Sequence, residues 1–128
     1  MSDYKITNLK ELKDSAVEFG LAPNLEARFA RKALEAERSG ISYQRLAPNF
    51  RGPFGHRHEA QEETYVVIGG SGRVKLDDGV HALRQWDALR VAPKTGRGFE
   101  AGPDGLEFLV FGAGESGDAE VLQDWWGE

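Results

Sequence analysis

The sequence predicts an all-β domain, built as a double-sheet jelly roll or a closed barrel. Short stretches rich in β-branched and aromatic residues recur along the chain, and turn signals separate them at regular intervals. The composition includes 16 glycines and a hydrophobic fraction of 40%, which suits short strands joined by tight turns. About eight such strands can be traced, a number that fits a jelly roll or a barrel.

The first part of the chain, Met1–Pro23, is predicted to form an N-terminal arm outside the barrel. Asn8 and Glu11 form a possible capping box at the start of a short helix. Several apolar residues then fall roughly on one helical face: Leu9, Leu12, Ala16 and Phe19. Gly20 and Pro23 would end this helix. The arm could pack on its own barrel or reach across to a partner subunit.

The next segment, Asn24–Arg38, is open to two interpretations. Strong helix formers over residues 30–38 favour an amphipathic helix, whereas the alternation over Leu25–Arg31 favours a strand and then a turn before Gly40. We predict the strand, and a further strand over Ile41–Leu46. The faces of this further strand carry Tyr43 and Arg45 on one side, and Ser42, Gln44 and Leu46 on the other. The sequence leaves open which face is inside.

Two of the three histidines lie in a predicted hairpin. His56 and His58 are separated by one residue, so in an extended strand both imidazoles point to the same face. A turn after His58 can reset the parity, and Glu63–Ile68 then forms a strand with Glu63 and Tyr65 on one face. Two imidazoles and a carboxylate on adjacent strands are the ligand set of a facial-triad metal site. The simpler alternative is a polar hairpin with solvated histidines.

The rest of the chain continues as strands and turns. Further strands are predicted at Arg73–Leu76, Val80–Leu83, Ala88–Ala92, Arg97–Glu100 and Leu106–Phe111. Tight turns are predicted at Gly69–Gly72, Asp77–Gly79 and Gly102–Gly105. The last strand is a continuous apolar run, so we expect it to be buried on both faces. A loop is expected over Gly112–Ala119, and the terminal Trp125 and Trp126 are expected to dock on the barrel or on a partner subunit.

The histidine hairpin resembles the first signature of the cupin superfamily. That signature has a glycine, five residues, His-x-His, three or four residues, a glutamate, six residues and a glycine. His56, His58, Glu63 and Gly70 fit it, whereas Phe50 occupies the place of the leading glycine. The resemblance implies a small single-domain cupin with a cupin-type double-stranded β-helix, or jelly-roll barrel, and a short N-terminal extension. The limits expected are an arm over 1–23, a barrel over 24–115 and a tail over 116–128.

The second cupin signature is only partly present. Trp86 takes the place of a usual glycine, and Arg97 takes the place of the histidine that is the fourth metal ligand in typical cupins. A shifted alignment would put Gly98 there instead. Two interpretations follow, because guanidinium does not normally ligate metal. Either an Arg97–Glu63 pair replaces the metal, or a three-ligand centre remains and Arg97 holds an anionic substrate, a task that its fork geometry suits.

The resemblance also implies a small-molecule site at the barrel mouth, often with a divalent transition metal such as Fe, Mn, Ni or Zn. The first hypothesis is a metal-dependent enzyme, of the oxygenase or isomerase type, that acts on a small anionic metabolite. His56, His58 and Glu63 would hold the metal, and Arg97, Tyr65 and Phe99 would contact the substrate. The alternatives are a metal-free small-molecule binding cupin and, less favoured, a structural interaction protein. The catalytic residues and the reaction stay unspecified.

The composition of the chain argues against some classes of binding partner and in favour of others. A net charge of −5 disfavours nucleic acid or an anionic membrane as a partner. The chain has no cysteine for a disulfide or a thiolate site. No apolar run is long enough to span a bilayer and no signal peptide opens the sequence, so we expect a cytoplasmic protein. The apolar surface of Leu106–Phe111 and the two terminal tryptophans predicts a homodimer.

Overall fold

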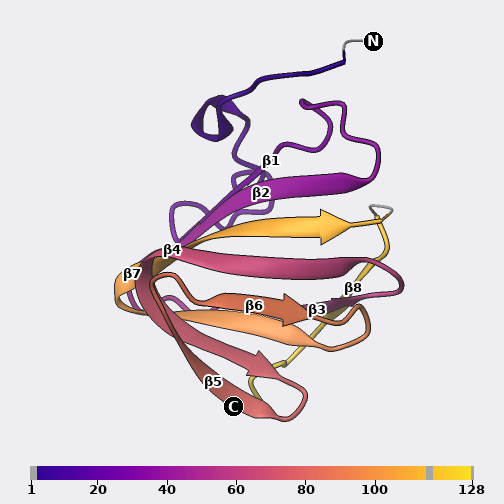
Figure 1. Ribbon diagram of the computed structural model, residues 1–128. Coiled ribbons are helices and arrows are strands. Elements are labelled where there is room, and N and C mark those ends of the chain that lie inside the picture. The colour runs from indigo at the N-terminus through magenta and orange to yellow at the C-terminus, as the bar shows by residue number, and fades with distance from the viewer. Residues whose placement is uncertain (1–2, 115–116, 128) are drawn as a thin grey trace.

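The computed structural model describes residues 3–114 and 117–127, and strands dominate it. The described elements are one short 3-10 helix, η1 (Leu9–Glu11), and the strands β1 (Leu25–Phe29), β2 (Ser39–Leu46), β3 (Gly55–His58), β4 (Glu62–Leu76), β5 (Gly79–Arg84), β6 (Ala88–Val91), β7 (Arg97–Ala113) and β8 (Ala119–Leu122). They form one antiparallel sheet that curls on itself (Figure 1). The predicted all-β barrel is therefore confirmed. None of the described residues belongs to a helix that is long and apolar enough to cross a membrane.

β4 and β7 are the two longest strands, and they pair with each other along most of their length. The sequence predicted tight turns at Gly69–Gly72 and Gly102–Gly105, and both predictions are wrong because the strands run on through these glycines. The strands bend together instead, with register shifts between Val67 and Gly72. A Cβ atom on Gly70 would lie 2.0 Å from the carbonyl oxygen of Gly105. The glycines therefore permit a close crossing of two backbones rather than a reversal of the chain.

The core lies between the curled halves of the sheet. Its buried residues include Leu46, Tyr65, Val67, Val74, Leu83, Val91, Phe99, Ala101, Leu106, Phe108 and Val110. Along β7, Leu106, Phe108 and Val110 face this core, whereas Phe111 is 43% exposed. The prediction that Leu106–Phe111 is buried on both faces is therefore wrong. The run is continuous in apolar residues, but alternate residues face the outer side, where the covering is incomplete.

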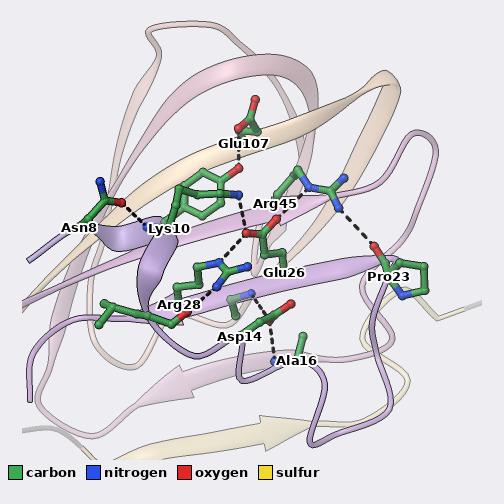
Figure 2. Close-up of polar contacts among 12 residues, drawn as sticks. Asn8, Lys10, Asp14, Ala16, Pro23, Glu26, Arg28, Arg45 and Glu107 are labelled. Carbon is green, nitrogen blue, oxygen red and sulfur yellow. Dashed lines mark hydrogen bonds and ion pairs between the residues drawn. The ribbon is translucent and has the colours of Figure 1, made fainter. Parts of the chain in front are cut away.

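The N-terminal arm holds only one short turn of helix. Asn8 caps η1 by accepting a hydrogen bond from the backbone N–H of Lys10 at 2.9 Å, but the helix ends at Glu11. The longer helix predicted up to Phe19 does not form. The reason is that Asp14 accepts hydrogen bonds from the backbone N–H groups of Ala16 and Ala27, both at 3.0 Å (Figure 2). These bonds fasten the segment to β1 along a path that is not helical.

A polar cluster covers the outer face of β1 and β2. Glu26 accepts hydrogen bonds from Lys10 at 2.6 Å, from Arg28 at 2.6 Å and from Arg45 at 3.2 Å (Figure 2). Burial opposes ionisation of Glu26, but these three hydrogen bonds outweigh it and lower its pKa from 4.5 to about 2. We call Glu26 with these three cations the outer cluster. It is completed by Tyr43, whose hydroxyl donates to Glu107.

The outer cluster also decides which face of β2 is inside. Tyr43 and Arg45 lie outside, under the arm, whereas Ser42, Gln44 and Leu46 lie opposite inward-facing residues of β7. The sequence had left this question open. In Figure 1 the arm lies beside β1 and β2, away from β5.

The tail contains a strand that the sequence did not predict. β8 pairs with β3 in an antiparallel register that sets Val121 opposite His56. The loop expected over Gly112–Ala119 is wrong at both ends, since β7 runs to Ala113 and β8 begins at Ala119. Trp125 then packs against the barrel, where its indole Nε1 donates to the carbonyl of Lys75 at 2.9 Å. Trp126 stacks on the guanidinium of Arg51, 4.4 Å from it. The predicted boundary between barrel and tail, at residues 115 and 116, lies outside the described residues.

Candidate metal centre

β3 and β4 bring three potential metal ligands together. His56 and His58 come from β3 and Glu63 from the start of β4. One ligand atom from each residue lies within 4.8 Å of those of the other two. The two imidazole rings are 5.1 Å apart and nearly perpendicular. We call His56, His58 and Glu63 the triad. The i, i+2 spacing on β3 and the turn before β4 produce this arrangement, because together they direct the three side chains to one point.

Asp118 holds the turn between the two strands and one of the histidines. One of its oxygens accepts hydrogen bonds from the backbone N–H of Ala60 at 2.7 Å and of Gln61 at 3.0 Å. The other lies 2.7 Å from Nδ1 of His58. These bonds, first that from Ala60, then that from His58 and then that from Gln61, hold the pKa of Asp118 well below its usual range. Sequence reasoning missed Asp118, since it lies 60 residues from His58 and no local motif marks it.

The contact with Asp118 fixes the tautomer of His58. An ionised carboxylate can only accept, so Nδ1 of His58 carries a proton, and in the neutral imidazole that a metal requires Nε2 presents its lone pair. Nε2 is buried and has no hydrogen-bond partner in the described part of the chain, although it lies 3.2 Å from Glu63. An unsatisfied buried polar atom costs about 1–3 kcal/mol. A metal ion would satisfy it, and a carboxylate behind a ligating histidine is the usual support for such an ion.

Glu63 is ionised at neutral pH. Burial raises its pKa, but hydrogen bonds from His56 and Tyr65 and the charges of the two histidines lower it from 4.5 to about 2. The hydroxyl of Tyr65 donates to Glu63 at 2.7 Å, and Nε2 of His56 lies 3.3 Å from the same oxygen. Burial, and then the charge of Glu63, raise the pKa of Tyr65 well above its usual value. The site therefore presents a carboxylate and a neutral phenol side by side.

Arg97 lies beside the triad in the barrel interior. It is the first residue of β7 and sits opposite His56 in the strand register, with none of its surface exposed. One terminal nitrogen donates to the carbonyl of Ala92 at 3.1 Å. Another is 4.0 Å from Glu63, and it has no hydrogen bond within the described residues. This distance is too long for a hydrogen bond. Arg97 and Glu63 therefore do not form the hydrogen-bonded pair that one interpretation of the sequence puts in place of the metal.

The alignment that places Arg97 at the usual histidine position fits the backbone. Trp86 takes the place of a glycine in that alignment and has a φ of 74°, in the region that glycine adopts readily. The neighbouring Asp87 accepts a hydrogen bond from the backbone N–H of Arg84 at 2.9 Å. Arg97 is also paired directly with His56, and such paired residues point to the same side of the sheet. In the shifted alignment, Gly98 would bring no side chain to the site.

The triad lines an open cavity of about 1080 Å³. Of the three residues predicted to contact substrate, Tyr65 lines this cavity, whereas Arg97 and Phe99 are not among its lining residues. Phe99 packs in the core, with its ring centre 4.8 Å from that of Tyr65 and 4.9 Å from that of Phe108. Arg97 is fully enclosed. Both side chains are enclosed in the packed interior, and their contact with substrate stays a prediction.

Comparison with known proteins supports the fold. No protein-family model matches the chain, and no curated protein sequence does. Among solved structures, a cupin protein from Bacteroides fragilis matches with a TM-score of 0.72 and 22% identity, over 91% of this chain and 88% of that one. The polyketide cyclase RemF from Streptomyces resistomycificus matches with a TM-score of 0.74 and 24% identity, over 93% of this chain and 84% of that one.

Oxalate decarboxylase from Bacillus subtilis is similar as well, with a TM-score of 0.79 and 20% identity over all of this chain. This chain spans only 34% of the oxalate decarboxylase chain. Identities this low establish the fold and leave the activity open. The protein therefore has the cupin fold, a double-stranded β-helix, as the histidine signature predicted.

Proposed function

We propose that this protein is a small metal-dependent enzyme of the cupin type, an oxygenase or an isomerase, that acts on an organic anion. The observation that carries the proposal is the buried Nε2 of His58, which lies 3.2 Å from Glu63 and has no hydrogen-bond partner among the described residues. The clustering of the three ligand atoms within 4.8 Å supports it. Similar structures that include a decarboxylase and a cyclase are consistent with an enzymatic role.

The residues present fit a divalent transition metal such as Fe, Mn, Ni or Zn. Two imidazoles and one carboxylate are a ligand set that leaves coordination positions open for substrate. When bound, the ion would polarise an oxygen of the substrate as a Lewis acid. Glu63 would hold the ion together with His56 and His58, and Tyr65 would orient Glu63 through its hydroxyl. Asp118 would keep His58 in the ligating tautomer.

The charge balance of this site favours an anionic substrate. A divalent ion with two neutral histidines and one carboxylate keeps a positive charge, and the enclosed Arg97 adds to it. An anion that binds the ion directly would neutralise this charge without touching Arg97. This differs from the direct contact with Arg97 that the sequence predicted.

A metal-free binding cupin is the second candidate. The observation in its favour is the same Arg97, which places a fixed cation 4.0 Å from Glu63. Two unit charges at this distance repel or attract by about 4 kcal/mol at an effective dielectric of about 20. Arg97 therefore weakens binding of a cation, and in a metal-free protein it balances the charge of Glu63.

Metal analysis distinguishes the two candidates. The protein should be purified without chelator or histidine tag, reconstituted separately with Fe, Mn, Ni and Zn, and analysed for bound metal. We expect bound metal in the wild type and its loss in His56→Ala and His58→Ala. His81→Ala is the matched control, because His81 is half exposed and its imidazole pairs with the turn residue Asp78. Wild-type protein that holds no metal after reconstitution would overturn the enzyme proposal and favour the metal-free one.

A further inference from the structure

A row of paired residues on the inner face of the sheet leads away from the triad. Tyr65 of β4 is paired with Val110 of β7, Val110 with Ser42 of β2, and Ser42 with Phe29 of β1. Directly paired residues of antiparallel strands point to the same side of the sheet. All four residues line the cavity. The row therefore forms a continuous floor from the metal centre to the edge strand of the barrel.

The length of this floor follows from strand spacing. Neighbouring strands lie about 4.8 Å apart, so the three steps from β4 to β1 span about 14 Å. The cavity volume of about 1080 Å³ lies just above the usual range for sites that hold drug-sized organic ligands. A small dianion at the triad would leave most of this space unused.

The lining beyond the triad is mostly apolar. The floor is flanked by Leu25 and Ala27 of β1, and Ala16 and Leu21 of the arm segment also line the cavity. Phe29 is 56% exposed at the far end, and Phe54 and Val121 are partly exposed lining residues from the β3 side. Apart from the triad, the charged residues of the described lining are Arg31, Lys32 and Glu35, which all belong to the turns that follow β1. A polar metal centre at one end and apolar walls elsewhere define an amphiphilic site.

We infer that the ligand of this site is an organic acid with an extended apolar body, aromatic or alicyclic, that binds the metal through its acidic group and lies across β7, β2 and β1 toward Phe29. This inference deepens the proposed function and rests on it for the position of the acidic end. The apolar floor itself does not depend on the metal. Small acids without such a body would bind only through the ion.

The inference is tested with two carboxylate probes of different size. Acetate and biphenyl-4-carboxylate should be titrated calorimetrically into metal-loaded protein and into metal-free protein. We expect biphenyl-4-carboxylate to bind at least about 100-fold more tightly than acetate, because burying each ring adds at least about a tenfold gain. Equal affinity for the two probes in metal-loaded and metal-free protein alike would overturn the inference.

A pair of variants locates the apolar body. Phe29→Ser removes the aromatic side chain at the far end of the floor, whereas Phe111→Ser removes a comparably exposed phenylalanine from the outer face of β7, outside the cavity lining. We expect Phe29→Ser to weaken binding of biphenyl-4-carboxylate about tenfold, with acetate binding and metal content unchanged. Phe111→Ser should change none of these. If both variants weaken binding equally, the floor does not hold the ligand.

Failure of this inference can be told apart from failure of the proposed function. If the protein holds no metal, the proposed function fails, but metal-free protein should still bind biphenyl-4-carboxylate in a manner that depends on Phe29. If metal is bound and the larger probe gains nothing over acetate, the proposed function stands and the inference fails. A second copy of the chain could cover the floor instead. Light scattering would then give a dimer that Phe29→Ser dissociates, together with no binding of the larger probe, and this result would also overturn the inference.

Discussion

Glu26 and Glu63 are two buried carboxylates with similar surroundings and different chemistry. Each has three basic side chains within 4.0 Å, which are Lys10, Arg28 and Arg45 around Glu26, and His56, His58 and Arg97 around Glu63. In each case the pKa of the glutamate is lowered to about 2. A perturbed pKa alone therefore does not separate a structural ion-pair cluster from a candidate site.

The two clusters differ in whether their buried polar atoms all have hydrogen-bond partners. In the outer cluster, both oxygens of Glu26 accept hydrogen bonds from cations at 2.6–3.2 Å. Around Glu63, by contrast, Nε2 of His58 and two nitrogens of Arg97 are buried without a hydrogen-bond partner among the described residues. Folding alone favours complete polar networks. The cluster around Glu63 is therefore the better candidate for binding a metal ion or another ligand.

The largest expected effect is on metal affinity when Glu63 loses its charge. We expect Glu63→Gln to weaken binding of Mn²⁺ or Zn²⁺ at least about 100-fold, because the only anionic ligand of the triad is lost and the cation of Arg97 is left unopposed. Glu26→Gln should leave metal affinity unchanged. Calorimetric titration of both variants checks this prediction. Equal metal affinity of Glu63→Gln and wild type would remove the distinction between the two clusters.

The second effect is on stability and belongs to Glu26. We expect Glu26→Gln to lower the free energy of unfolding at pH 7 by at most about 3 kcal/mol. The folded-state pKa of about 2 lies below the ordinary value of 4.5, so this stabilisation is complete above pH 4.5 and is lost as the pH falls toward 2. Urea denaturation at a series of pH values measures the difference. A difference between variant and wild type that stays constant down to about pH 2 would contradict the assignment.

The third prediction concerns the support of His58. We expect Asp118→Asn to weaken metal binding by about 10–100-fold, because an amide can donate to Nδ1 and so place the proton of His58 on Nε2. The amide keeps one oxygen for the backbone N–H groups of the turn. Glu120→Gln is the control, since Glu120 also lies in the tail but pairs with the exposed Arg57. The prediction fails if both variants lose metal affinity in proportion to a common loss of stability.

The smallest expected effect comes from replacing the enclosed cation. We expect Arg97→His to raise metal affinity about tenfold or more, because it removes the repulsion of a fixed charge and supplies an imidazole near the triad. Binding of acetate to the metal-loaded protein should fall in the same variant. Arg45→His, in the outer cluster, should change neither. Metal and acetate titrations that show no change in Arg97→His would mean that the charge of Arg97 does not act on the site.

Much of the site could be predicted from local spacing. The i, i+2 separation of His56 and His58 directs both imidazoles to one face of any extended strand, and a turn before Glu63 brings its carboxylate to the same place. The hairpin at Asp77–Gly79 likewise follows from its turn residues. Alternation and turn chemistry act over a few residues, so the sequence by itself determined the all-β class, the hairpins before Glu63 and at Asp77–Gly79, and the convergence of the triad.

Only the tertiary structure decided which distant segments meet and which faces are buried. Asp118 reaches His58 because β8 pairs with β3, and Arg97 is enclosed beside Glu63 because β7 begins opposite β3. The glycines at 69–72 bend a long strand, since its partner crosses there at close range. Local propensity is the same for a turn and for a bend, and for an inner and an outer face of β2. Long-range strand pairing and the burial that it imposes decide between these alternatives. Neither can be predicted from the spacing of neighbouring residues.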